Sequence, residues 1–96
     1  MTTFGHAPVA LRRAVSSRDR IVIRFARGGD LTDVSRLADL CDRPIPSWPL
    51  LLAEADGELV AAVSTRTGDV IRDPFVASDD VVALLQLRAA QLDRAA

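Results

Sequence analysis

The stretch Leu50-Leu51-Leu52-Ala53-Glu54-Ala55-Asp56-Gly57-Glu58-Leu59-Val60-Ala61-Ala62-Val63-Ser64 decides the fold of this chain. Its central Asp56-Gly57 pair favours a tight type I′ turn, in which both central residues take a positive φ. The sequence therefore predicts a β-hairpin with strands over residues 50–55 and 58–64. Residues 59–63 are all apolar, which is typical of a central strand that is covered on both faces.

A strand and an amphipathic helix are predicted upstream of the hairpin. Residues 21–27 are rich in β-branched and aromatic residues, which favours a strand with Ile21, Ile23 and Phe25 on one face. Two glycines end this strand, and the Asp30 that follows them is a residue type that caps helices. The next helix is predicted over residues 31–41, with one apolar stripe at i, i+3, i+4 spacing. The stripe consists of Leu31, Val34, Leu37, Ala38 and Cys41.

A proline-rich connection joins that helix to the hairpin. Pro44, Pro46 and Pro49 end the helix and predict an extended, stiff segment. Trp48 lies in this segment. We interpret its side chain as a lid that covers the core, and the alternative is a platform on which a ligand stacks.

A short edge strand and a second helix are predicted downstream of the hairpin. A glycine turn leads into the segment 70–76, where Pro74 has no backbone N–H to donate to a neighbouring strand. Ser78 is expected to cap the final helix, and Asp79 and Asp80 in its first turn suit the helix dipole. Its apolar stripe consists of Val81, Leu84, Leu85, Ala89 and Leu92, widened by Val82 and Leu87.

The predicted element order is β-α-β-β-β-α. The simplest packing of this order is an α+β fold, with one small antiparallel sheet and one helix on each face. Residues 21–96 are predicted to form a single domain. Residues 1–20 mix small, polar and basic residues and predict a flexible basic arm.

The residue composition excludes several kinds of site. All twelve basic residues are Arg, and Tyr is absent, so neither a Schiff-base lysine nor a tyrosine acid is present. Cys41 is the only cysteine and His6 the only histidine, so one chain can form neither an internal disulfide nor a zinc site. We interpret the Cys41 thiol as buried and inert. Glu54 and Glu58 flank the hairpin turn, where solvent exposure rather than catalysis is expected. We therefore predict no catalytic, cofactor-binding or metal-binding residue.

The hydropathy and the charge distribution of the sequence indicate where the protein is located and what it could bind. No apolar run approaches the about 20 residues that span a bilayer, and the N-terminus lacks the apolar core of a secretory signal, so we predict a cytoplasmic protein. Residues 1–27 carry six Arg and one Asp, whereas residues 28–96 carry six Arg and twelve acids. This asymmetry raises the alternative of a nucleic-acid or acidic-surface contact through the arm. We favour a different interpretation, in which the arm is an exposed leader or contacts the acidic body of the same chain.

Three pieces of the sequence in this order, residues 21–31, 34–40 and 50–62, resemble the N-terminal half of the GNAT (GCN5-related N-acetyltransferase) family. Ile23-Arg24-Phe25-Ala26-Arg27-Gly28-Gly29-Asp30-Leu31 is similar to the family's I-R-x-A-x-x-x-D-L opening. Leu51-Leu52-Ala53-Glu54-Ala55-Asp56-Gly57-Glu58-Leu59-Val60-Ala61 is similar to its L-L-A-E-x-D-G-x-L-V-A hairpin. The resemblance covers residues 21 to about 76, and it implies the first half of the family's fold.

The resemblance stops where that family binds its cofactor. In the family an R/Q-x-x-G-x-G/A loop and a helix N-terminus receive the pyrophosphate of acetyl-CoA. The corresponding residues 73–80 contain no glycine, and Asp79-Asp80 begins the helix. The resemblance therefore implies a GNAT-like half fold without the cofactor loop, and we predict no cofactor.

The favoured hypothesis is a non-catalytic protein-interaction or self-associating module. A sheet that lacks the family's remaining strands has an open edge at residues 70–76, which a second copy or another protein could complete. One alternative is a reduced N-acetyltransferase-like protein that binds acetyl-CoA or another acyl donor, and the other is a binder that acts through the basic arm. The candidate interaction surface consists of Trp48, Val70, Ile71, Phe75, Val82 and Leu87.

Overall fold

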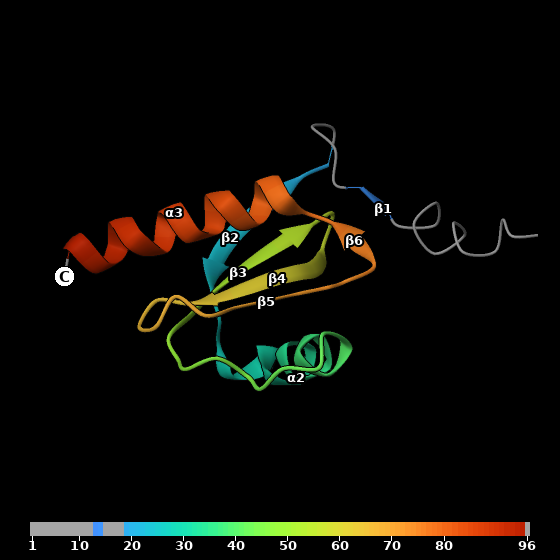
Figure 1. The fold of residues 1–96 in the computed structure, drawn as a ribbon, viewed down its shortest axis with the longest axis horizontal. Coiled ribbons are helices and arrows are strands. Elements are labelled where there is room, and N and C mark those ends of the chain that lie inside the picture. Colours follow the sequence, from blue (N-terminus) through green and yellow to red (C-terminus); the bar gives the residue numbers. More distant parts are fainter. Residues whose placement is uncertain (1–12, 15–18, 96) are drawn as a thin grey trace, which may run out of the picture.

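The computed structural model describes residues 13–14 and 19–95 and forms an α+β fold (Figure 1). The main sheet has four antiparallel strands in the order β2-β3-β4-β5, and β1 pairs in parallel with β6 beside it. The sequence prediction of a small antiparallel sheet is confirmed. The elements are β1 (Arg13–Ala14), β2 (Ile21–Phe25), the 3-10 turn η2 (Gly28–Asp30), α2 (Leu31–Leu40), β3 (Leu50–Ala55), β4 (Glu58–Ser64), β5 (Val70–Arg72), β6 (Val76–Ala77) and α3 (Asp79–Ala95).

The β1–β6 pair was not predicted. It places two residues of the predicted arm beside the domain, with Arg13 opposite Val76 and Ala14 opposite Ala77. The rest of the arm before Asp19 lies outside the described residues. A two-residue pairing leaves almost no trace in a sequence, because neither its length nor its hydrophobic pattern distinguishes it from a loop.

The β3–β4 hairpin forms with the predicted boundaries and turn. Asp56 has φ 51° and Gly57 φ 85°, the two positive values that a type I′ turn requires. Asp56 also ties the turn to the start of β2. Its backbone N–H donates to the Arg20 carbonyl at 2.9 Å, and its Oδ1 accepts the Arg20 N–H at 2.9 Å.

A β-bulge in β4 sets which residues face each helix. Ala53 lies opposite Ala61 while its neighbour Glu54 lies opposite Leu59, so Val60 is an extra residue in β4. As a result Val60 and Ala61 both pack on the α3 side of the sheet, although they are adjacent in the chain. Alternation resumes at Ala62, which packs on the α2 side.

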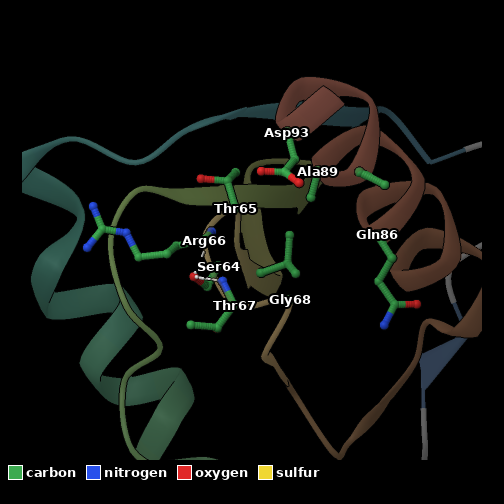
Figure 2. A pocket seen from close by; sticks show the side chains of 10 residues that line it. Ser64, Thr65, Arg66, Thr67, Gly68, Gln86, Ala89 and Asp93 are labelled. Carbon is green, nitrogen blue, oxygen red and sulfur yellow. Dashed lines mark hydrogen bonds between the residues drawn. The ribbon is translucent and has the colours of Figure 1, made fainter. Parts of the chain in front are cut away.

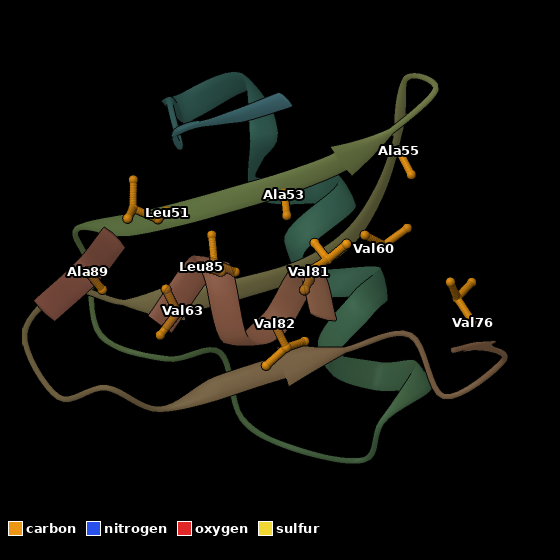
Figure 3. Packing of buried hydrophobic residues seen from close by; sticks show 11 residues of the cluster. Leu51, Ala53, Ala55, Val60, Val63, Val76, Val81, Val82, Leu85 and Ala89 are labelled. Atoms are coloured by element: carbon orange, nitrogen blue, oxygen red, sulfur yellow. The ribbon is translucent and has the colours of Figure 1, made fainter. Parts of the chain in front are cut away.

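Two buried clusters lie on opposite faces of the sheet, each closed by one helix. This confirms the prediction of one helix on each face. The α3-side cluster is shown in Figure 3, and it consists of Leu51, Ala53, Ala55, Val60, Ala61, Val63, Val76, Val81, Val82, Leu85 and Ala89. The α2-side cluster consists of Val34, Leu37, Ala38, Leu50, Leu52, Ala62 and Ile71.

The predicted apolar stripes are wider than the buried ones. On α3, Leu85 is fully buried, but Leu84 is 50% exposed, so its place on the core-facing stripe is wrong. Leu87, predicted as part of the candidate interaction surface, is 53% exposed. Successive helical residues are about 100° apart, and a stripe centred on Leu85 leaves both leucines off the sheet. Leu31, the first residue of α2, is also 50% exposed, and Cys41 is half-buried just after the helix ends.

Neither predicted cap forms as expected. Asp30 makes no side-chain hydrogen bond to the start of α2; its carboxylate bonds instead to the Arg27 N–H at 2.7 Å and to Arg24. Ser78 is buried, and its hydroxyl has no hydrogen-bond partner among the described residues. Ser78 contributes to the first turn of α3 only through its backbone carbonyl, which accepts the Val82 N–H at 2.9 Å.

Among the described residues, no helix combines the length and the apolar character needed to cross a membrane.

The position of the α3 stripe can be tested with two leucine substitutions. Leu85→Ala opens a cavity between α3 and the sheet and is expected to lower the free energy of unfolding by about 2–5 kcal/mol. Leu84→Ala on the exposed face is the matched control and should change it by about 0.5 kcal/mol or less. Urea unfolding followed by circular dichroism measures both, and equal losses would contradict this packing.

Candidate interaction site at the sheet edge

The described part of the chain contains one compact cluster of charged side chains. The Arg24 guanidinium on β2 makes a bidentate contact with Asp30, with both nitrogen–oxygen distances at 2.8 Å. A third hydrogen bond at 3.2 Å joins Arg24 to Glu54 on β3. The side chains of Asp30 and Glu54 are 16% and 23% exposed. The expectation that Glu54 is solvated is therefore wrong, because the diagonal strand register brings Arg24 beside it.

The electrostatics of this cluster are structural rather than catalytic. Hydrogen bonds from Arg24, and then from the Arg27 N–H, hold the pKa of Asp30 well below its usual range. Hydrogen bonds to Asp30 and then to Glu54 raise the pKa of Arg24 further above neutrality. Neither group changes its charge near neutral pH, which a general acid or base must do. No group of three His, Cys, Asp or Glu side chains in the described residues could hold a metal ion.

A hollow of about 340 Å³ lies between the β4–β5 turn and α3 (Figure 2). Thr65, Arg66 and Gly68 line it from the turn, and Gln86 and Asp93 from α3. Ser64 is buried beneath the turn, and its Oγ accepts the backbone N–H groups of residues 66 and 67 at 3.1 and 3.0 Å. The serine oxygen thus holds the turn together, and no histidine is available in the described residues to activate it.

A larger hollow of about 590 Å³ runs along the free edge of β5. Val70, Arg72 and Pro74 contribute from β5 and the turn that follows it. One wall carries Cys41 and Arg43, at the end of α2, and the other carries Val82 of α3. The edge strand therefore lies in a groove between the two helical layers, which we call the β5 groove.

The backbone of β5 presents to this groove N–H and C=O groups that no described strand pairs with. Asp69 accepts from the Ser64 N–H at 2.9 Å and Asp73 donates to the Val60 carbonyl at 3.0 Å, so both face β4. Backbone groups alternate along an antiparallel strand. Ile71 therefore also faces β4, while the N–H and C=O groups of Val70 and Arg72 face outward.

Two arginine side chains line the β5 groove, one in an ion pair and one without an ion pair to any described residue. Arg72 contacts Asp79 at the start of α3 at 2.6 Å, but the side chains are 41% and 84% exposed, and an ion pair this exposed contributes little. Arg43 is exposed and forms no ion pair with any described residue. The groove therefore combines the outward backbone groups of β5 with apolar side chains (Val70, Pro74 and Val82), and it carries a positive charge at the rim nearest α2.

The structure brings together only two of the six residues in the predicted interaction surface. Val70 and Val82 line the β5 groove, although Val82 is 8% exposed and also packs in the α3-side cluster, so its prediction as an exposed surface residue is wrong. Ile71 is 1% exposed and packs on the α2 side of the core, so its assignment to a surface is wrong. The reason is the alternation of side chains along β5, which turns Ile71 inward when Val70 and Arg72 line the groove.

The other three predicted surface residues lie apart from the groove lining. Phe75 is 64% exposed in the turn between β5 and β6, and Leu87 is 53% exposed on α3. Trp48 is 38% exposed and belongs to neither buried cluster, so its interpretation as a core lid is wrong. Sequence reasoning missed Arg43 and Arg72 as groove residues, because no local pattern shows that the end of α2 approaches β5.

The Arg24–Asp30 pair is expected to make the free energy of unfolding fall as the pH falls. Because the pKa of Asp30 is lower in the folded chain, the pair stabilises fully above the unfolded-state pKa of about 3.9. That stability is lost as the pH falls toward the folded-state pKa. We expect Asp30→Asn to be less stable at pH 7 and to lose less stability between pH 7 and pH 2. Urea unfolding at each pH measures the two slopes.

Asp33→Asn is the matched control for this substitution. Asp33 is an exposed acid in the first turn of α2 and forms no ion pair with a described residue. Its removal costs the helix-dipole contribution alone. Identical pH profiles for the two variants would show that the Arg24 pair does not stabilise the fold.

Comparison of the chain with protein-family models, with curated proteins and with solved structures finds no match in any of the three.

Proposed function

We propose that this chain is a non-catalytic protein-interaction module that binds an extended segment of a partner protein in the β5 groove. The observation that carries this proposal is an edge strand with outward-facing backbone groups at the floor of a groove. An added strand bonds to such an edge through its main chain and gains specificity from the side chains that meet the walls.

The groove chemistry defines the segment that it fits. Val70 and Arg72 each offer one N–H and one C=O, which suits a segment whose alternate residues pair with β5. Val70, Pro74 and Val82 favour apolar side chains on that segment. Arg43 favours an acidic side chain near the α2 wall, since a rim charge attracts its opposite and steers association. The proposed ligand is therefore an extended peptide that alternates apolar and acidic residues.

We also propose that the domain is a GNAT-like half fold, on the strength of its element order and the two quoted segments. The start of α3 does not favour a pyrophosphate. Asp79 and Asp80 lie in its first turn, where a bound anion would meet like charge. The preceding N–H groups of Phe75 and Val76 are already bonded to Asp73, at 2.8 and 3.2 Å. A reduced acyltransferase is thus the less supported alternative.

Two further proposals rest on the sequence. A cytoplasmic location follows only from the hydropathy pattern. Binding of nucleic acid through the basic arm rests on residues that mostly lie outside the described part of the chain, so it stays the least supported of the three functions.

Peptide binding at the β5 groove can be tested with a defined probe. A fluorescein-labelled peptide of alternating valine and aspartate is titrated with the protein, and fluorescence anisotropy is recorded. We expect saturable binding that weakens about tenfold in Arg43→Glu, because one attraction becomes a repulsion. Arg88→Glu reverses an exposed charge on α3 at a residue that does not line the groove, and it is the control. No binding, or equal loss in both variants, would overturn the proposal.

The alternative of an acyl-donor protein predicts a different result. A ligand at one hundred times its dissociation constant stabilises a folded protein by about 2.7 kcal/mol. We expect acetyl-CoA at millimolar concentration to leave the melting temperature unchanged, since residues 73–80 offer no phosphate loop. A saturable rise, absent with free adenosine diphosphate at the same concentration, would favour the acyl-donor alternative instead.

A further inference from the structure

The opposite edge of the sheet is formed by β2, which is longer than β5 and also has no described strand on its outer side. β2 has five residues against three in β5, and it pairs with β3 on one side only. The main packing partners of α3 are β3 and β4, and those of α2 are β4 and β5. Neither helix has β2 among its main packing partners, although Ile21 and Ile23 of β2 pack against the α3-side cluster. No residue of β2 is fully buried, whereas five of the six in β3 are.

The backbone groups of β2 divide between β3 and the outside. The Arg20 carbonyl accepts the Asp56 N–H and the Ala26 N–H donates to Leu50, each at 2.9 Å. Because the direction of the backbone groups alternates along an antiparallel strand, Val22 and Arg24, which lie between these two ends, also bond to β3. The N–H and C=O groups of Ile21, Ile23 and Phe25 therefore face outward, with no described strand beside them. The Phe25 C=O also accepts a hydrogen bond from Arg24 Nη1 at 3.3 Å, and its second lone pair stays available to an added strand.

The side chains along this edge are complementary to a second copy of themselves. Ile21, Ile23 and Phe25 lie on the α3 face opposite Ala55, Ala53 and Leu51. Phe25 is 48% exposed on that face, and Val22 is 37% exposed on the other. The one charge on β2, Arg24, is already held by Asp30 and Glu54 of its own chain. Such an edge offers apolar contacts and no free cation that would repel an identical edge.

We infer that two copies of this chain associate through their β2 edges, antiparallel and with Ile23 opposite Ile23 of the second copy. In this register Ile21 lies opposite Phe25 in both directions. Each of these residues exchanges its N–H and C=O with the residue opposite, at a Cα separation of about 5.5 Å. Aromatic and β-branched pairs of this kind are the favourable cross-strand contacts of antiparallel sheets. A two-fold axis through Ile23 closes the assembly at a dimer.

A second copy fits β2 better than β5. Only Val70 and Arg72 face outward on β5, and Pro74 ends the run of donors. A two-fold pairing centred on Arg72 would also place two cations side by side. Pairing through β2 avoids the short run of donors and the facing cations. It leaves a β5 groove at each end of a continuous eight-stranded sheet. The inference therefore goes beyond the proposed peptide site and does not depend on it.

The mass of the protein in solution is the first test. Light scattering after a sizing column is expected to give twice the 10.3 kDa chain mass. Phe25→Lys places a charge on the edge and is expected to give the single-chain mass with unchanged circular dichroism. Leu84→Lys alters an equally exposed apolar residue on α3 and should keep the double mass. A monomer for the unaltered chain, or dissociation by Leu84→Lys alone, would overturn the inference.

Cysteine cross-linking tests the register separately. All variants carry Cys41→Ser, so that the introduced thiol is the only one. Under mild oxidation Ile23→Cys is expected to form a disulfide-linked dimer on a non-reducing gel, because the residue faces itself across the two-fold axis. Phe25→Cys alone should not cross-link, but it should when mixed with Ile21→Cys. A double mass without this pattern would place the dimer at another surface.

The peptide titration distinguishes the two proposals from one another. Phe25→Lys is expected to bind the valine–aspartate probe as the unaltered chain does, because β2 and β5 are opposite edges of the sheet. Loss of probe binding together with loss of the dimer would show that the two edges are not independent.

Discussion

The β3–β4 hairpin is apolar on both faces, and the rest of the structure follows from the need to cover it. Leu50 and Leu52 face one side and Leu51 the other, all of them at 2% exposure or less. Leaving either face in water would cost about 25 cal/mol for each square ångström of apolar surface. One helix per face is the smallest cover available to a chain of this length, and α2 and α3 supply it.

The bulge at Val60 adapts this hairpin to two helices of unequal length. α2 has ten residues and α3 seventeen, and the α3-side cluster is the larger. Because Val60 and Ala61 both turn toward α3, that face gains one more side chain from β4 than strict alternation allows. The Arg24–Asp30–Glu54 contacts then hold β2 to β3 and to the start of α2. These three charged side chains thus fix the position of β2 in the sheet.

The two edges of the sheet differ in what they can bind. The β5 edge is short, ends at Pro74 and lies between helical walls that carry Arg43 and Val82. A peptide with its own side-chain pattern suits such a groove. The β2 edge is longer and carries apolar side chains, which suits a second sheet edge. Covering one edge leaves the other free, so the two proposed interactions are compatible in one assembly.

Local patterns in the sequence determined the hairpin, its turn, both helices and the α+β class. Each of these depends on residues close together in the chain: Asp56-Gly57 for the turn, and the apolar periodicity for the strands and helices. Tertiary structure alone decided which apolar residues are buried. Ile71 and Leu84 are equally hydrophobic, but strand alternation turns the first inward and helical rotation turns the second outward. It also decided that Asp30 binds Arg24 instead of capping α2, and that Arg43 approaches β5. These contacts join residues whose separation in the chain says nothing of their distance in space, and packing is what sets that distance.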